Sequence, residues 1–444
     1  MGNSLGSLDC RDRPGGCINL KRLKESLVES GRFGRNPPVR VENYEDLDLG
    51  KGVTRPTGSE ADRMVRDYAV RLMEEAGLEV RVDVVGNIFG RLEGAKTRVG
   101  AVMTGSHLDS VINGGQFDGA LGVFGAIEAV RSLIEEGFIN ERPIEIVVFT
   151  GEEGSAFKPS LLGSSVLVGK LRSEEALSAR NDEGVTLEEA LDRIGYKGDF
   201  VRNLDDVEYM VELHIEQGPV LWREGVSLGV VENITGITWL AATIEGEANH
   251  AGTTPMTMRK DALVAAAEIV QLINRRAKEI GPTTVGTVGR LNVHPNGINI
   301  IPGRVEMGID IRDVIQDNML MFRDEVIEKL KQLEVGYGVK VDVQTLFTHK
   351  PAPLSPEVIS AVEDAAARVG VRSKRMNSGA GHDSQNMAER VKTGMIFVPS
   401  VRGISHSPLE WTDWNDVGTG VQILKETIKL LSTKPHKVTQ STTT

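Results

Sequence analysis

Short apolar runs alternate with amphipathic stretches along most of this chain. Residues 99–103 and 144–150 are apolar, partly β-branched runs of the kind that form buried strands. Residues 120–136 have helical character, and Ser59 followed by acidic residues is a typical start for a helix that closes at Gly77. Strands that alternate with helices of this length predict a doubly wound α/β sheet.

The pattern changes near Val231. From there to about Leu346 the predicted order is strand, helix, strand, strand, helix, strand, which is typical of a ferredoxin-like α+β unit. Alternating strands and helices then resume and continue to the last predicted helix. We therefore predict a discontinuous main domain at 18–230 and 347–433, an inserted domain at 231–346, and flexible tails at 1–17 and 434–444.

Composition narrows the possible function classes. The 444-residue chain is long enough for two domains, and its formal net charge of −12 argues against a nucleic-acid or anionic-membrane partner. No apolar run approaches the length of a membrane-spanning helix, and the N-terminus lacks the apolar region of a secretory signal. Cys10 and Cys17, the two cysteines, lie in a polar leader away from every motif. The sequence therefore predicts a reduced, cytoplasmic protein.

Histidines and acids gather at the ends of the predicted strands. His107 and Asp109 follow the first apolar run, and a Gly-Gly turn then brings in Asp118. Such a group suits a metal site in which His107 is a ligand, Asp109 holds its other ring nitrogen, and Asp118 bridges two ions. Glu152 and Glu153 follow the next strand, where one carboxylate can bind a metal while its neighbour stays free as a base.

Two further clusters have the same placement. His214 and Gln217 follow the apolar residues 209–211, and His406 follows the strand predicted near Phe397. A single cluster of this kind is more often a capped strand end or a solvated charge pair. Because several occur together at strand ends, the sequence favours a dinuclear metal site built from nitrogen and oxygen ligands, without thiolate.

These motifs resemble those of a known superfamily. The segments 107–110 (HLDS), 115–119 (GQFDG), 152–154 (EEG) and 405–407 (SHS) resemble the dinuclear-zinc aminoacylase and carboxypeptidase superfamily. The segment 214–219 (HIEQGP) resembles its hydantoinase/carbamoylase branch, which contains N-carbamoyl-L-amino-acid hydrolases, allantoate amidohydrolases and β-ureidopropionases. The resemblance implies a mixed-sheet catalytic domain with an inserted ferredoxin-like lid and dimerisation domain.

The resemblance also implies ligands for two divalent metal ions per subunit, zinc foremost, with manganese, cobalt or nickel as alternatives. One ion would be held by His107, Asp118 and His214, and the other by Asp118, Glu153 and His406. Glu152 would act as the general base.

The inserted domain would supply groups that bind the substrate. In this superfamily a histidine matching His250 stabilises the oxyanion and usually serves the partner subunit's site. Arg312 and Asn299 suit a substrate carboxylate, although a strand-end ion pair with Asp310 or Asp313 is an equally simple interpretation of Arg312. The opposite wall of the site would be formed by Gly381 and His382. Gln217 is a further candidate for binding the substrate.

The leading hypothesis is hydrolysis of the ureido C–N bond of N-carbamoyl-L-amino acids to amino acid, CO2 and ammonia. Allantoate and β-ureidopropionate are the alternative substrates, because they share the ureido group and the carboxylate. An aminoacylase or peptidase is a second class of hypothesis, and a catalytically inactive binding protein is a third. We expect a small carboxylate-bearing ureido compound as the partner, no nucleic acid or membrane, and a homodimer through residues 231–346.

Overall fold

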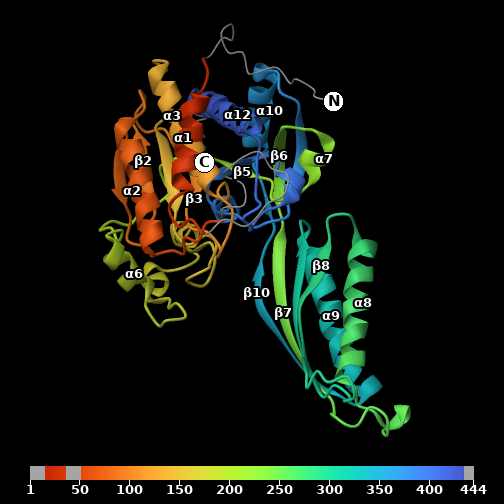
Figure 1. Cartoon of the computed structure of the whole chain (residues 1–444). Helices are drawn as coiled ribbons and strands as arrows, with labels where there is room; N and C mark the ends of the chain where they lie inside the picture. The colour runs from red at the N-terminus through yellow and green to blue at the C-terminus, as the bar shows by residue number, and fades with distance from the viewer. Residues whose placement is uncertain (1–15, 37–51, 435–444) are drawn as a thin grey trace, which may run out of the picture. The chain divides into compact units, whose positions relative to one another are not determined.

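The computed structural model describes residues 16–36 and 52–434 (Figure 1). These residues form two compact units. The smaller unit comprises Asn233–Pro353 and Asn377–Gly381, and the larger unit contains the described residues on either side of these segments. Most of both predicted tails, residues 1–15 and 435–444, lies outside the described ranges.

The larger unit is built on a nine-stranded mixed sheet. Its central strands β4, β3, β5 and β13 are neighbours and run parallel, whereas the outer strands pair antiparallel. The order across the sheet is β1 (Glu79–Val82), β2 (Ile88–Leu92), β4 (Ile144–Phe149), β3 (Ala101–His107), β5 (Val207–Ile215), β13 (Lys392–Val398), β6 (Leu228–Ile234) and β11 (Ala352–Pro353), with β12 (Ser373–Ser378) also paired to β6.

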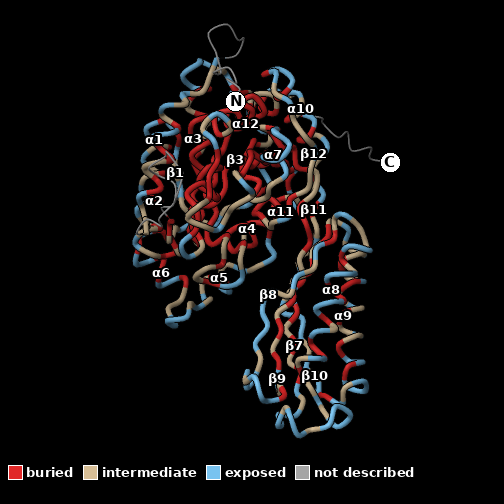
Figure 2. The backbone as a smooth tube through the Cα atoms, turned by 45° about the vertical axis from the view of Figure 1, so that its right-hand side comes forward, coloured by how far each residue is buried: buried red, intermediate tan, exposed pale blue. Residues whose placement is uncertain are grey.

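Helices and loops cover both faces of this sheet, which explains why β3 and β4 are buried along their whole length (Figure 2). Helices α3 and α12 pack together against the central strands, and α10 packs on α12. Side chains of α4 and α11 join a second core cluster with Met103, Phe149 and Met210. The helices are α1 (Leu20–Ser30), α2 (Glu60–Glu75), α3 (Ala120–Glu135), α4 (Leu162–Leu167), α5 (Ser173–Ser178), α6 (Leu187–Ile194), α7 (Val220–Glu224), α10 (Pro356–Val369), α11 (Asp383–Met387), α12 (Trp414–Ser432) and the 3-10 turn η2 (Val401–Gly403).

The smaller unit is a four-stranded antiparallel sheet in the order β10-β7-β9-β8 with two long helices. Burial alternates residue by residue along β7 and β9, because α8 and α9 pack on one face and leave the other face open. The elements are β7 (Gly236–Glu245), η1 (Met256–Met258), α8 (Ala262–Ile280), β8 (Val285–His294), β9 (Arg304–Asp313), α9 (Gln316–Tyr337) and β10 (Lys340–His349). This order and topology confirm the predicted ferredoxin-like unit.

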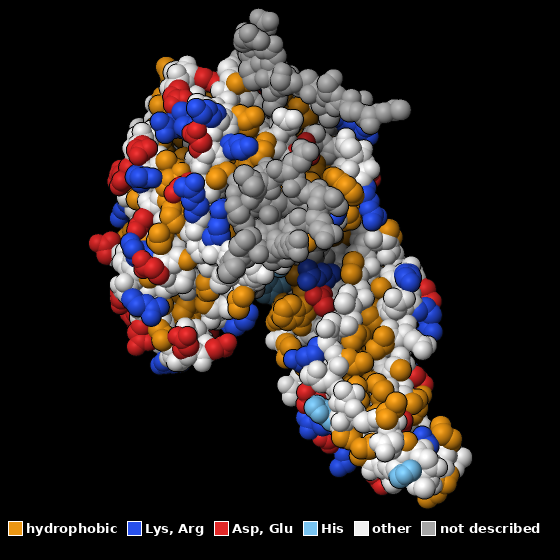
Figure 3. Space-filling view, in the orientation of Figure 1, with side chains coloured by type: hydrophobic (Ala, Val, Ile, Leu, Met, Phe, Trp, Pro, Cys, Tyr) orange, Lys and Arg blue, Asp and Glu red, His pale blue; other side chains and the backbone are white. Residues whose placement is uncertain are grey.

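Exposed hydrophobic side chains gather on the surface of the smaller unit (Figure 3), among them Met256, Val264 and Val270. The chain reaches this unit through β6 and leaves it through β11, and these two strands pair antiparallel, with Ile234 opposite Ala352.

The predicted α/β alternation is confirmed, and Ser59 caps α2 by accepting a hydrogen bond from the Asp62 N–H. The sequence analysis did not predict the short helices α4 to α7 and α11 or the strands β6 and β12. A signal was available for α6, because Thr186 and Glu189 form a reciprocal capping box. Cys17 is disulfide-bonded, against the expectation of a reduced protein. No helix in the described ranges is long and apolar enough to span a membrane.

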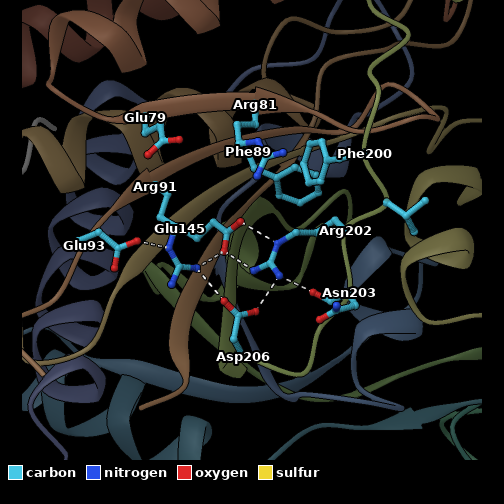
Figure 4. A pocket seen from close by; sticks show the side chains of 11 residues that line it. Glu79, Arg81, Phe89, Arg91, Glu93, Glu145, Phe200, Arg202, Asn203 and Asp206 are labelled. Atoms are coloured by element: carbon cyan, nitrogen blue, oxygen red, sulfur yellow. Dashed lines mark hydrogen bonds and ion pairs between the residues drawn. The ribbon is translucent and has the colours of Figure 1, made fainter. Parts of the chain in front are cut away.

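A cavity of about 350 Å³ lies at the β1–β2–β4 side of the larger unit (Figure 4). Glu145 projects into it from β4 and binds two arginines: Arg91 Nη1 lies 3.1 Å from Oε2, and Arg202 Nε lies 3.0 Å from Oε1. Asp206 accepts a hydrogen bond from each of the same arginines. Because these charges neutralise one another, we assign the cavity a structural role.

Glu145→Gln is expected to lower the free energy of unfolding by about 2 kcal/mol, because two partly buried guanidinium groups lose a charged acceptor. Glu93→Gln is the matched control, since Glu93 also binds Arg91 but its side chain is 72% exposed, and it should change stability little. Urea denaturation of the three proteins measures both effects. Equal effects of the two substitutions would contradict the structural role of Glu145.

Candidate metal centre

Four parallel strands of the larger unit carry the predicted ligands to one edge of its sheet. His107 is the last residue of β3, and Glu153 lies in the loop that follows β4. His214 is the last residue but one of β5, and His406 lies in the loop after β13. Because the four strands are adjacent and parallel, their carboxyl ends meet at one edge, where α/β sheets bind their ligands.

Asp118 lies at the centre of this group. Its Oδ1 is 3.4 Å from His107 Nε2 and 3.3 Å from His214 Nε2, while its Oδ2 is 3.4 Å from His406 Nε2. Glu153 Oε2 lies 3.5 Å from the same His406 nitrogen. Two groups that share Asp118 are each compact enough to hold one ion: His107 with Asp118 and His214, and Asp118 with Glu153 and His406.

Gly119 makes this approach possible. It has a φ of +63°, and a Cβ at this position would lie 2.5 Å from the His107 ring. Its N–H points to His214 Nε2 at 3.3 Å. A side chain here would therefore displace a predicted ligand, which explains why glycine begins the turn into α3.

Asp109 makes different contacts from those expected. His107 Nδ1 lies 3.0 Å from the backbone oxygen of Asp109 and 3.8 Å from its carboxylate. The carboxylate instead accepts hydrogen bonds from the N–H groups of Glu152 and Glu153, both at 3.2 Å. Asp109 therefore holds the loop of the two glutamates with its side chain and contacts the His107 ring with its carbonyl group.

Gln217 contacts a predicted ligand. Its Nε2 donates to Asp118 Oδ2 at 2.7 Å. Ser405 Oγ lies 3.1 Å from the same oxygen and 2.8 Å from Glu410 Oε2. Glu410 Oε1 in turn accepts from the N–H groups of Phe117 and Asp118. Side chains around Asp118 thus fix the orientation of its carboxylate.

Two buried charged residues near the site were missed by the sequence analysis. Glu410 stands four residues after His406, so its position in the same short motif was an available signal. Arg55 is fully buried and donates to the backbone oxygens of Leu108 and Ser30, and burial lowers its pKa to about 10. It lies in a Gly- and Pro-rich segment without periodicity, where nothing in the sequence marks it.

Burial and close charges shift the pKa values of the site in opposite directions. Burial raises the pKa of Glu152 well above its usual range, and raises that of Glu153 to about 7. Hydrogen bonds from three histidines overcome burial at Asp118 and hold its pKa well below the usual value. The contact with Asp118 raises the pKa of His406 to about 9.

His382 lies beside the predicted ligands. Its ring packs against that of His214 with 4.6 Å between centroids, and burial followed by repulsion from His214 lowers its pKa well below the usual range. Glu212 is within reach of both rings, but Ser106 Oγ and Ser384 Oγ donate to its carboxylate at 2.7 and 2.6 Å. A neutral His382 can therefore act as a hydrogen-bonding group.

The smaller unit carries His250 and Asn299 on neighbouring loops. His250 is exposed, and its Nδ1 accepts hydrogen bonds from the N–H groups of Gly252 and Thr253 at 2.9 and 3.2 Å. The proton of the neutral ring is therefore on Nε2, which has no hydrogen-bond partner among the described residues of the smaller unit. Asn299 is joined to this loop through its backbone oxygen, which accepts from the Ala251 N–H.

Arg312 forms an ion pair with Asp310, which the sequence analysis gave as the alternative to substrate binding. Its Nε and Nη2 donate to the two carboxylate oxygens of Asp310 at 2.9 and 2.8 Å, and its Nη1 donates to the Gly379 backbone oxygen at 2.8 Å. Gly381 belongs to the same short segment, Asn377–Gly381, of the smaller unit. A Cβ at Gly379 would meet nothing within 4 Å, so a ligand has room to approach this backbone.

Comparison with known proteins decides the family. Residues 103–430 match the model of peptidase family M20/M25/M40. The chain belongs to this family. The N-carbamoyl-L-amino-acid amidohydrolase of Paenarthrobacter aurescens is 39% identical over 415 residues, which cover 93% of this chain and 98% of that protein. The allantoate amidohydrolase of Bacillus subtilis is 37% identical over 362 residues, which cover 81% and 88%.

A solved structure identifies the branch of the M20 family to which this chain belongs. The amidase of the hydantoinase/carbamoylase family from Burkholderia multivorans superimposes with a TM-score of 0.89 at 37% identity, covering 95% of this chain and 100% of that one. This M20 chain is therefore an amidohydrolase of the hydantoinase/carbamoylase type, as the motifs predicted. Its M20 fold, with a mixed-sheet catalytic domain and a separate four-stranded unit, is confirmed.

The donor groups suit the dinuclear metal site of the M20 family. The two groups built on Asp118 offer imidazole nitrogens and carboxylate oxygens, which are ligands for zinc and similar divalent ions. His107, Asp118 and His214 are buried, whereas the His406 side chain is 50% exposed. The site is therefore accessible to solvent at His406.

Metal binding is expected to release protons at pH 7. His406 and Glu153 have pKa values of about 9 and about 7 in the metal-free protein, and both must lose their proton to become ligands. Lowering the pH from 8 to 6 protonates more of these groups, so the affinity for the metal should fall. Calorimetry in buffers of different ionisation enthalpy measures the released protons.

The control for this measurement is His294→Gln, a substitution in the smaller unit that should leave proton release unchanged. His406→Ala should reduce the proton release. Metal binding without any proton release would contradict the assignment of His406 and Glu153 as ligands.

Proposed function

We propose that this protein hydrolyses the ureido C–N bond of N-carbamoyl-L-amino acids, giving the amino acid, CO2 and ammonia. The observation that carries the proposal is the placement of Glu152. This carboxylate lies 3.7 Å from His107 Nε2 and stands outside the two groups that share Asp118, while a further group of possible ligands joins it to His107 and Glu153. A site of this kind has ligands for two ions and a separate carboxylate for proton transfer.

The metal centre would be held by His107, Asp118, Glu153, His214 and His406. Two bound zinc ions would lower the pKa of a water molecule and polarise the carbamoyl C=O, which is otherwise a poor electrophile.

Glu152 performs the proton transfers of the proposed reaction. It takes a proton as the water oxygen forms its bond to the carbamoyl carbon. It later gives that proton to the departing nitrogen of the amino acid as the C–N bond breaks. The carbamate that remains decomposes to CO2 and ammonia. Asp109 supports this role, because its carboxylate binds the Glu152 N–H and so fixes the base.

His250 is proposed to stabilise the oxyanion. Its Nδ1 is occupied by two backbone N–H groups, so its Nε2–H is available as a hydrogen-bond donor. We propose that it serves the site of the partner subunit in a homodimer formed through the smaller unit. The open edges of the β10-β7-β9-β8 sheet and the exposed hydrophobic side chains of this unit support such an interface (Figure 3).

Arg312 and Asn299 are proposed to bind the substrate carboxylate. This group is shared by N-carbamoyl amino acids and allantoate, and the similarity to the Bacillus subtilis allantoate amidohydrolase keeps allantoate as the second candidate. Hydrolysis rates on an N-carbamoyl-L-amino acid, allantoate and a dipeptide, measured on the zinc-loaded enzyme, separate the candidates. Preference for the dipeptide would overturn the proposal.

Glu152→Gln is expected to keep both metal ions and to lower kcat by about 10²- to 10⁴-fold, because it removes the base without removing a ligand. Metal content by elemental analysis and steady-state kinetics measure the two properties. His107→Ala is the control and should lose metal as well as activity. If Glu152→Gln loses metal to the same extent, Glu152 is a ligand and its role as the base is wrong.

The role of His250 in the partner's site can be tested by complementation. Glu152→Gln and His250→Ala are each expected to be inactive, yet mixed dimers of the two contain one site with both groups intact. Random exchange of subunits should therefore restore about one quarter of the wild-type activity.

A mixture of Glu152→Gln with His107→Ala is the matched control. Both changes disable the same kind of site, so these mixed dimers should stay inactive. If subunits exchange, as shown by mass measurements, and the first mixture still remains inactive, His250 does not act in the partner's site.

A further inference from the structure

The open face of the smaller sheet carries a row of side chains that spans three strands. Phe347 on β10 is opposite Trp239 on β7, and Trp239 is opposite Asp310 on β9. A bulge between Thr345 and Phe347 shifts the register of β10 and brings Phe347 opposite Trp239. The two rings are 4.5 Å apart between centroids, so the indole is held in place by an aromatic contact.

The only donor of the Trp239 side chain, the indole N–H, is bound to Asp310. The indole Nε1 donates to Asp310 Oδ2 at 2.9 Å, and the same carboxylate accepts two hydrogen bonds from Arg312. Arg312 lies two residues further along β9, so its side chain leaves the same face of the sheet. The side chains of Asp310 and Arg312 are 26% and 28% exposed, and water can therefore reach the pair.

Arg312 keeps free hydrogen-bonding capacity in this arrangement. A guanidinium group has five N–H bonds, and partners within residues 16–36 and 52–434 use three of those on Arg312: Asp310 accepts two and the Gly379 backbone oxygen accepts one. One N–H remains on each terminal nitrogen. Asp310 therefore fixes the plane of the guanidinium group, and two donors stay available to a second carboxylate.

We propose that Asp310 and Trp239 are positioning residues that orient Arg312 toward the carboxylate of the substrate. This inference rests on the proposed function, in which Arg312 binds that carboxylate. The ion pair and the substrate-binding role of Arg312 are then compatible, because they use different N–H groups. The bond to Gly379 also ties Arg312 to the segment Asn377–Gly381, which belongs to the same smaller unit.

Two substitutions test the chain from Trp239 to Arg312. Trp239→Phe keeps an aromatic ring beside Phe347 but replaces the indole by a smaller phenyl group and so removes the N–H donor. Asp310→Asn removes the charge and one of the two carboxylate acceptors. We expect KM for an N-carbamoyl-L-amino acid to rise about tenfold in Asp310→Asn and less in Trp239→Phe, with kcat nearly unchanged. An N-carbamoyl amine without a carboxylate should be hydrolysed as by the wild type.

Glu306→Gln is the matched control. Glu306 lies on the same strand and binds Arg304 at 2.8 Å with the same two-residue spacing, so it should leave KM unchanged. A double-mutant cycle adds a second test. In an Arg312→Lys background, Trp239→Phe should have no further effect on KM, whereas a merely structural contribution would persist.

Binding of the free amino acid to the metal-loaded protein gives a readout without turnover. Calorimetry should show weaker binding in Arg312→Lys and in Asp310→Asn, in the same proportion as the rise of KM.

The outcomes separate the two proposals. If the wild type hydrolyses no ureido compound but still binds the amino acid in a way that depends on Arg312 and Asp310, the proposed function fails and the inference stands. If ureido hydrolysis is present and the Asp310 and Trp239 variants affect both substrates equally, or neither, the inference is overturned.

Discussion

Burying several carboxylates close together is the constraint that shapes this protein. Each loses the hydration it would have in water, and each repels the others, so the free energy cost is large unless positive charge is supplied. Arg55 is a buried cation among these acids, and three imidazoles surround the central carboxylate. Burial raises the pKa values of the other four acids, which favours their protonated forms in the metal-free protein. The acids are Asp109, Asp118, Glu152, Glu153 and Glu410.

The same constraint links metal binding to the fold. Divalent ions that replace protons in this cluster would remove repulsion between side chains that the strands hold together. The hydrogen bond from Gln217 and the backbone contacts of Glu410 hold Asp118 in its orientation before any ion is bound. An orientation that is fixed in advance lowers the entropy lost on binding the metal.

The sequence predicts the gathering of the ligands because it depends on a simple rule. Parallel strands place their carboxyl ends at one edge, and His107, Glu153 and His406 each lie at or just after such an end. The direction of a loop side chain follows no comparable rule. The carboxylate of Asp109 turns to the neighbouring loop, and Gln217 turns to Asp118, because the backbone beyond each strand bends in ways that spacing does not encode. The residues around Arg55 show no hydrophobic periodicity, so the sequence gives no indication that Arg55 is buried.

The point where the smaller unit joins the larger sheet has a consequence for the origin of the molecule. Ile234 and Ala352 are paired neighbours, so the chain leaves the sheet and returns to it at adjacent positions. A short turn could connect the same two positions without shifting the register of any other strand. An ancestral protein with a plain hairpin here could therefore acquire the whole smaller unit in a single insertion, and the strand ends that carry the predicted ligands would not have to be rebuilt.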